Sequence, residues 1–88
     1  MRSSDGLDDR RKRLLFRSWR RGTREMDLIL GRFADAAIAS LTEEELTQFE
    51  RLLDVPEPDL YAAFTGDQPI PDGWPRPLFL RIKAFLPA

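Results

Sequence analysis

A stretch of nine residues, 19–27, holds the side chains of this chain best suited to chemistry with another molecule. It places arginines on both sides of Gly22, and two carboxylates, Glu25 and Asp27, follow. Glycine has no Cβ, so it can take the positive φ that ends a helix, and a partner's backbone can approach it closely. Guanidinium and carboxylate groups would form charge-assisted hydrogen bonds with that partner. The candidate partner-binding residues are Arg20, Arg21, Gly22, Arg24, Glu25 and Asp27.

The same residues also have a purely structural explanation. A glycine after one helix and a glutamate in the first turn of the next are ordinary features of a joint between two helices. Two features favour a function beyond that joint. Arginines 20, 21 and 24 place three positive charges close together. Asp27 adds a second carboxylate within two turns. Taken alone, the residues leave both interpretations open.

Composition excludes several kinds of chemistry. The chain has no cysteine and no histidine, so it offers no thiol nucleophile, zinc finger or imidazole base. No D-x-D-x-D-G loop for a cation is present, and no apolar run approaches the roughly 20 residues of a membrane span. The polar segment 1–6 lacks the apolar core of a secretory signal. These absences predict a cytoplasmic protein that binds no metal and does not insert into membranes.

Charge divides the chain into two halves. Residues 1–32 carry ten Lys/Arg and five acids, whereas residues 33–88 carry four and ten. Eight of the fifteen residues 10–24 are basic, which is typical of a phosphate-binding surface. The pI of 5.4 and the acidic second half disfavour nucleic acid and favour a protein partner. A basic-helix nucleic-acid binder and a generic helical interaction module are the two alternatives.

Hydrophobic periodicity predicts helices and no sheet. The expected helices are 7–21, 24–39, one from the Thr42 capping box to Pro56, one from Pro58 at its first position to Gly66, and 75–85. Together they predict an all-α fold, a compact five-helix bundle. It forms a single helical domain, 7–88, after a disordered lead-in, 1–6.

Three further expectations concern packing. Tyr61 and the phenylalanines lie at helical core spacings and are expected to be buried. Gly31, inside a helix, costs about 1 kcal/mol relative to alanine, so we expect it either to allow close packing or to carry strain. Trp74 lies in a proline-rich loop, 67–77, that is expected to wrap the surface. This tryptophan is either a lid over the core or an exposed contact.

Arg21-Gly22-x-x-Glu25, with Asp27 after it, resembles the R-G-x-x-E motif of the FAD assembly factor SdhE / succinate dehydrogenase assembly factor 2 family. The resemblance continues through most of the chain, over about residues 10–64. The matching segments are the basic helix with Leu14 and Trp19, residues 26–33, 41–45, 49–53 and 58–60. The tail from Gly66 onward departs from it.

The resemblance implies a small helical fold with no catalysis of its own. Members of this family bind the flavoprotein subunit of succinate dehydrogenase, and in bacteria also that of fumarate reductase. They promote covalent attachment of FAD to a histidine of that subunit, so the partner carries the FAD and this chain would bind none. By residue, the resemblance implies that Arg21, Gly22 and Glu25 contact the partner and that Asp27 supports them.

Overall fold

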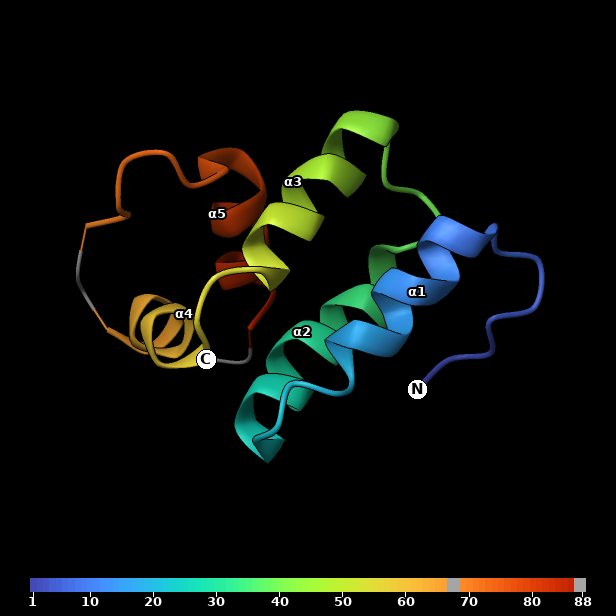
Figure 1. The fold of residues 1–88 in the computed structure, drawn as a ribbon, viewed down its shortest axis with the longest axis horizontal. Coiled ribbons are helices and arrows are strands. Elements are labelled where there is room, and N and C mark those ends of the chain that lie inside the picture. The colour runs from blue at the N-terminus through green and yellow to red at the C-terminus, as the bar shows by residue number, and fades with distance from the viewer. Residues whose placement is uncertain (67–68, 87–88) are drawn as a thin grey trace.

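The computed structural model describes residues 1–66 and 69–86, and this part of the chain contains five helices and no strand (Figure 1). The helices are α1 (Asp9–Ser18), α2 (Arg24–Ala37), α3 (Glu43–Leu53), α4 (Glu57–Thr65) and α5 (Arg76–Phe85). The predicted all-α fold with five helices is confirmed. The first two residues of the predicted loop 67–77 lie outside the described ranges.

The first helix is shorter than predicted. It begins after Asp8, whose side chain accepts from the Arg11 amide, and it ends after ten residues instead of continuing to Arg21. The amides of Trp19 and Arg20 each donate to a carbonyl three residues back at 3.2 Å, which tightens the last turn. The Arg21 amide then donates to the Asp27 carboxylate and not to a helical carbonyl. Arg20 and Arg21 therefore belong to the loop after α1.

The other helix boundaries follow the local signals in the sequence. Thr23 caps α2 by accepting from the Met26 amide, and both halves of the Thr42–Glu45 capping box are formed at α3. Pro58 was predicted to occupy the first position of its helix. Helix α4 begins at Glu57, so Pro58 occupies the second position. Proline there removes no intrahelical hydrogen bond, because the first amides of a helix have no partner within it.

The core lies between the five helices and contains four of the six phenylalanines, Phe33, Phe49, Phe64 and Phe79. The prediction that every phenylalanine and Tyr61 are buried is wrong for three residues. Phe16 is 51% exposed, Phe85 46% and Tyr61 39%. In α1 the adjacent leucines 14 and 15 already face the core, so the next residue around the helix points outward.

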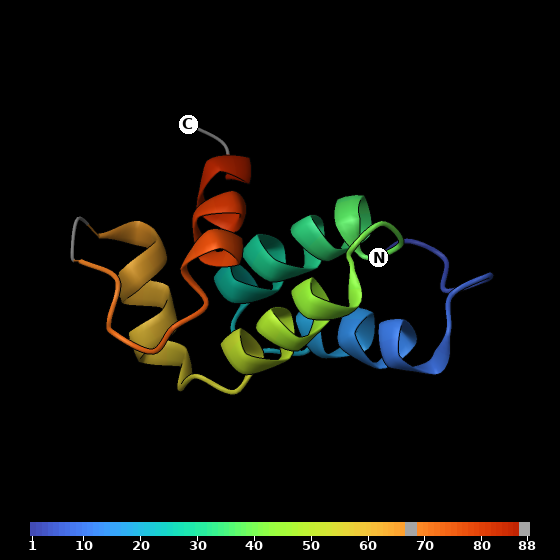
Figure 2. The same cartoon turned by 90° about the horizontal axis from the view of Figure 1, so that it is seen from above.

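Helices α1, α2 and α3 lie alongside one another, and α4 and α5 pack at one end of this group (Figures 1 and 2). Gly31 of α2 lies against the indole ring of Trp19, and a Cβ there would overlap the ring. The indole N–H donates to Asp35 at 3.0 Å. The expected close packing at Gly31 is confirmed, and it joins the end of α1 to the middle of α2.

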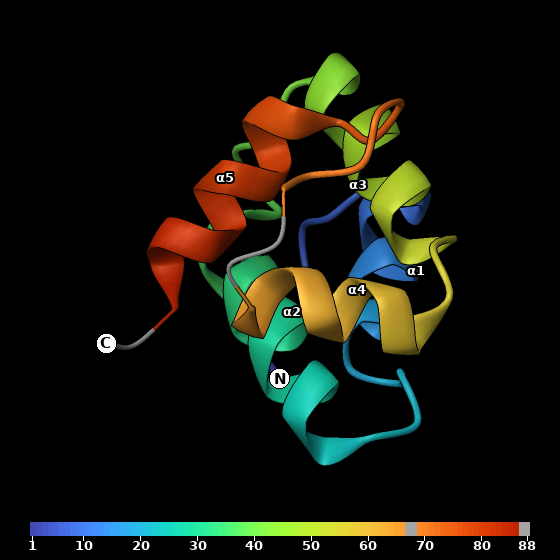
Figure 3. The ribbon, with the colours of Figure 1, turned by 90° about the vertical axis from the view of Figure 1, so that its left-hand side faces the viewer.

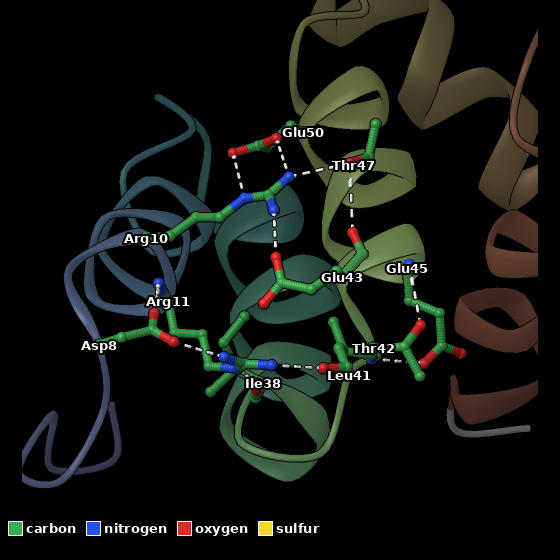
Figure 4. Close-up of polar contacts among 10 residues, drawn as sticks. All are labelled: Asp8, Arg10, Arg11, Ile38, Leu41, Thr42, Glu43, Glu45, Thr47 and Glu50. Atoms are coloured by element: carbon green, nitrogen blue, oxygen red, sulfur yellow. Dashed lines mark hydrogen bonds and ion pairs between the residues drawn. The ribbon is translucent and has the colours of Figure 1, made fainter.

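Two arginines of α1 hold this helix to its neighbours (Figure 4). Arg10 donates to both carboxylate oxygens of Glu50, at 3.1 and 2.7 Å, and also to Glu43 and Thr47. Arg11 donates to the carbonyls of Ile38 and Leu41, which follow α2. Because each guanidinium presents several donors in one plane, one side chain can connect several segments. We call this contact region of α1 with α2, α3 and the link between them the seam.

Two remaining segments lie at the edges of the fold. Residues 1–6 form no helix, and the Arg2 amide donates to Asp35 at 2.9 Å. That this segment is disordered stays a prediction. Trp74 is half-buried and packs edge-on against the Phe79 ring, with the centroids 5.8 Å apart, so it covers the core. Within the described ranges, no helix is long and apolar enough to cross a membrane.

Candidate functional site: the corner between α1 and α2

The loop after α1 and the first turn of α2, which together we call the corner (residues 20–27), contain all six candidate residues. Gly22 has φ +102°, a left-handed conformation that favours glycine. The chain turns there, and Thr23 starts α2. Arg20, Gly22, Arg24 and Glu25 are exposed, whereas Arg21 and Asp27 are half-buried. The structure therefore divides the candidates into an outward group and an inward group.

Arg21 points inward, although the sequence analysis proposed it as a partner-binding residue on the surface. Its side chain is only 11% exposed. Its Nη1 donates to the Leu53 carbonyl at 2.6 Å, and its Nη2 donates to the Val55 carbonyl at 3.3 Å. These carbonyls lie at the C-terminal end of α3, where a cation is favoured by the helix dipole and by carbonyls that lack a helical partner. Arg21 thus holds the corner against the end of α3.

The same guanidinium forms an imperfect ion pair with Glu57. The Arg21 Nε and Glu57 Oε1 atoms are 3.9 Å apart, and both are buried without a hydrogen-bond partner among the described residues. Burial lowers the pKa of Arg21, and the Glu57 carboxylate partly offsets this change. An arginine nevertheless stays charged at neutral pH. The corner therefore contains a half-buried charge pair whose hydrogen bonds are incomplete.

Asp27 also serves the corner from inside. Its Oδ1 accepts from the Arg21 backbone amide at 2.7 Å, six residues earlier in the chain. Its own amide donates to the Thr23 carbonyl in the first turn of α2. The carboxylate fixes the path of the loop, because it accepts from an amide that the end of α1 leaves without a helical partner. That Asp27 supports partner contact, as the resemblance implies, stays a prediction.

The outward side of the corner borders a pocket of about 250 Å³ (its surroundings are seen in Figure 3). Thr23, the N-cap of α2, and Glu25 line it on one side, and Glu57, Pro58 and Tyr61 of α4 line it on the other. Figure 3 shows the start of α4 beside the corner. A Cβ on Gly22 would meet only Glu57 Oε2, at 3.9 Å, so this edge is open. The pocket offers two carboxylates and an exposed aromatic ring to a partner.

Sequence reasoning missed the contribution of α4 to this site. Tyr61 was expected in the core, and Glu57, just before the predicted helix start at Pro58, was assigned no role. About 30 residues separate them from the corner. Hydrophobic periodicity cannot predict that segments so far apart in the sequence lie close together in the fold. The one available signal was the resemblance itself, which includes residues 58–60 beside both side chains.

The chemistry that the corner can offer is limited to polar contacts and shape. Within residues 1–66 and 69–86, no three acidic side chains are grouped so that they could hold a metal ion. The corner presents positively and negatively charged hydrogen-bonding groups around an open glycine, with a concave surface beside it. Such an arrangement can orient a second macromolecule by charge and shape.

Comparison with known proteins yields one family and several curated relatives. The family described as the flavinator of succinate dehydrogenase matches residues 12–86, which include the whole corner. The FAD assembly factor SdhE of Acetobacter pasteurianus is 39% identical over 80 residues, covering 91% of this chain and 73% of that protein. No solved structure matches the chain.

Mitochondrial proteins also match. Succinate dehydrogenase assembly factor 2 of Debaryomyces hansenii is 36% identical over 84 residues, covering 92% of this chain and 59% of the relative. The factor of the same name from Scheffersomyces stipitis is 40% identical over 76 residues, covering 83% and 51%. The chain thus spans about half to three quarters of the length of these three relatives.

Proposed function

This chain belongs to the family of flavinators of succinate dehydrogenase, and on that basis we propose that it is an assembly factor for a flavoprotein. It binds the flavoprotein subunit of succinate dehydrogenase and promotes covalent attachment of FAD to that subunit. The observation that carries this proposal is the family match over residues 12–86. The flavoprotein subunit of fumarate reductase is a second candidate partner, and the proposed location is the cytoplasm of a bacterium.

We assign the six corner residues two kinds of role. Gly22 allows the partner's backbone to approach, and Arg20, Arg24 and Glu25 form hydrogen bonds that set its register. Arg21 and Asp27 are positioning residues, because the guanidinium of one and the carboxylate of the other are engaged within the chain. The pocket beside Glu25 gives the partner a concave surface for a side chain.

The proposed mechanism is binding without catalysis by this chain. With neither cysteine nor histidine, the chain has no thiol or imidazole with which to form the bond to FAD. The flavin and the residue that it modifies both belong to the partner. Binding of the corner would stabilise the partner conformation that brings them together, which reduces the entropic barrier to the reaction.

Co-expression with the flavoprotein subunit tests the proposal at Gly22. We expect Gly22→Arg to remove flavin that stays on the subunit after acid denaturation, measured as in-gel fluorescence. The long arginine side chain blocks the open edge. A residue other than glycine at the positive φ of position 22 also costs about 1–2 kcal/mol of stability. Gly6→Arg is the matched control, since Gly6 also has a positive φ (+83°) and no atom within 4 Å of an added Cβ. Normal flavinylation with Gly22→Arg would contradict the assignment.

Glu25→Gln tests the outward carboxylate separately. Loss of its charge should weaken binding to the subunit about tenfold, in the range of a charge-assisted hydrogen bond. Stability should change by less than about 0.5 kcal/mol, because Glu25 is exposed. Titration calorimetry with the purified subunit measures the first quantity and urea unfolding the second. Equal affinities for the two proteins would exclude Glu25 from the interface.

Co-purification from the native host separates this function from the alternatives. A flavoprotein subunit retained on the tagged chain supports the proposal, and its absence from the Gly22→Arg eluate ties it to the corner. Retention of an unrelated protein would point to a generic interaction module. Retention of nucleic acid, lost at raised salt, would point to the basic-helix alternative.

A further inference from the structure

The outward face of α1 forms a second surface that the corner does not explain. The exposed residues from the start of α1 to the corner fall at helical spacing on one face. They are Asp9, Lys12, Arg13, Phe16, Arg17 and Arg20. Figure 2 shows α1 along one edge of the molecule, with α2 and α3 on its inner side. This face is basic, with an aromatic ring at its middle.

Three cations of this face, Lys12, Arg13 and Arg20, differ from the paired arginines of α1, of which Arg17 lies on the same face. Arg10 and Arg11 are engaged in the seam, and Arg17 pairs with Asp54 at 2.8 Å. Lys12, Arg13 and Arg20 form no ion pair with any residue that the structure describes. Adjacent like charges on an exposed helix do not stabilise it. No ion pair of the fold therefore accounts for these three cations.

Phe16 gives this face an apolar centre. Its ring is half in solvent, and the Arg20 guanidinium lies over it, 4.7 Å from the centroid. This cation–π contact keeps both side chains at the surface in a defined arrangement. Aromatic residues and arginines are the side chains enriched at the energetic centres of protein interfaces. Arg20 also continues the face into the corner, two residues before Gly22.

We propose that Lys12, Arg13, Phe16 and Arg20 form a second contact surface, the α1 stripe, which binds an acidic surface of the same flavoprotein subunit around an apolar depression that receives Phe16. This inference rests on the proposed function and extends its interface along α1. The unpaired cations of the stripe are complementary to carboxylates, and the continuity with Gly22 lets one partner cover both surfaces.

A protein fits the stripe better than nucleic acid. The stripe holds three unpaired cations, and the second half of the chain carries ten acids against four bases, which would repel a phosphate backbone. A single aromatic ring covered by an arginine offers no stacking series for successive bases. An acidic protein surface needs neither an extended basic track nor repeated aromatic rings.

Affinity for the purified flavoprotein subunit, measured at about 50 and 200 mM salt, tests the stripe. Arg13→Glu should weaken binding about tenfold at low salt and reduce the salt dependence, because it reverses a charge that attracts the partner. Phe16→Ala should weaken it fivefold or more at both salt concentrations. The matched controls are Arg76→Glu and Leu80→Ala, exposed changes of the same kinds on α5, which should bind as wild type.

The outcomes separate this inference from the proposed function. Wild-type affinity in both stripe variants, with Gly22→Arg still defective, would overturn the stripe alone. Normal binding by Gly22→Arg with defective stripe variants would overturn the corner alone. If the wild-type chain does not bind the subunit, both fail. Stripe-dependent binding to an oligonucleotide, with normal subunit binding by the same variants, would assign the stripe to nucleic acid and overturn the inference.

Discussion

The seam and the corner are adjacent regions built around arginines, and they differ in how completely those arginines are bonded. In the seam, Arg10 and Arg11 each donate to several acceptors, including both oxygens of Glu50. In the corner, Arg21 reaches two carbonyls, but its Nε stays 3.9 Å from Glu57 and unbonded. The seam is a completed contact between helices, whereas the corner retains unbonded charge beside an open glycine.

We propose that this difference separates a region that stabilises the fold from a region that binds a partner. A guanidinium with its donors satisfied holds helices together and has little to offer a partner. The corner leaves one inward ion pair incompletely bonded, and separately it exposes a carboxylate, a positive-φ glycine and a neighbouring pocket. Polar groups that are not optimised for the fold are a recurring property of functional surfaces.

The largest expected effect is at Arg21. Replacing it with methionine keeps much of the side-chain volume but leaves the carbonyls of Leu53 and Val55 without their donor and Glu57 without its cation. We expect a loss of about 2–3 kcal/mol in the free energy of unfolding, measured with urea. Arg17→Met is the matched control, because its exposed pair with Asp54 should be worth less than about 1 kcal/mol. Equal losses would erase the distinction between inward and outward arginines.

A double-mutant cycle sharpens the same point. If Arg21 and Glu57 interact across 3.9 Å, Glu57→Gln should recover part of the loss caused by Arg21→Met. The recovery should be smaller than the total, since the carbonyls of α3 still lack a donor. Strictly additive changes would show that Arg21 acts through those carbonyls alone.

An intermediate effect is expected at Gly31, where α2 meets the end of α1. Alanine favours a helix by about 1 kcal/mol, but its Cβ would overlap the Trp19 ring, and overpacking costs typically 1–3 kcal/mol. We expect a net loss of about 1–2 kcal/mol together with a shift in Trp19 fluorescence, measured in a Trp74→Phe background. A more stable protein with an unchanged spectrum would mean that the ring is not confined there.

The smallest effect concerns acid. The Arg10 side chain, by its hydrogen bond, lowers the pKa of Glu50 from its usual 4.5. Its contribution to stability is therefore fully present above pH 4.5 and is lost as the pH falls through the lower folded-state pKa. Because this carboxylate is 37% exposed, the contribution should be below about 1 kcal/mol. Between pH 7 and pH 3, the free energy of unfolding measured with urea should fall less in Glu50→Gln than in wild type. Identical pH profiles for the two proteins would show that this ion pair of the seam has no electrostatic role in stability.

Much of the fold could be predicted because its signals are local. The threonine caps at positions 23 and 42 and the prolines at 56 and 75 mark helix boundaries through bonds and steric limits within a few residues. The end of α1 was wrong by three residues, because a carboxylate six positions later binds the Arg21 amide. The location of the candidate site followed from residue types, and its division into inward and outward groups did not.

The sequence by itself determined the helices, the turn at Gly22, the absence of thiol and imidazole chemistry, and the family. These depend on backbone geometry, composition and short-range spacing. Only the tertiary structure decided that Arg21 faces α3, that Glu57 and Tyr61 stand beside Glu25, and that Lys12, Arg13 and Phe16 remain outside. The direction of a long side chain depends on acceptors that distant segments supply, and those acceptors come within reach only when the helices pack.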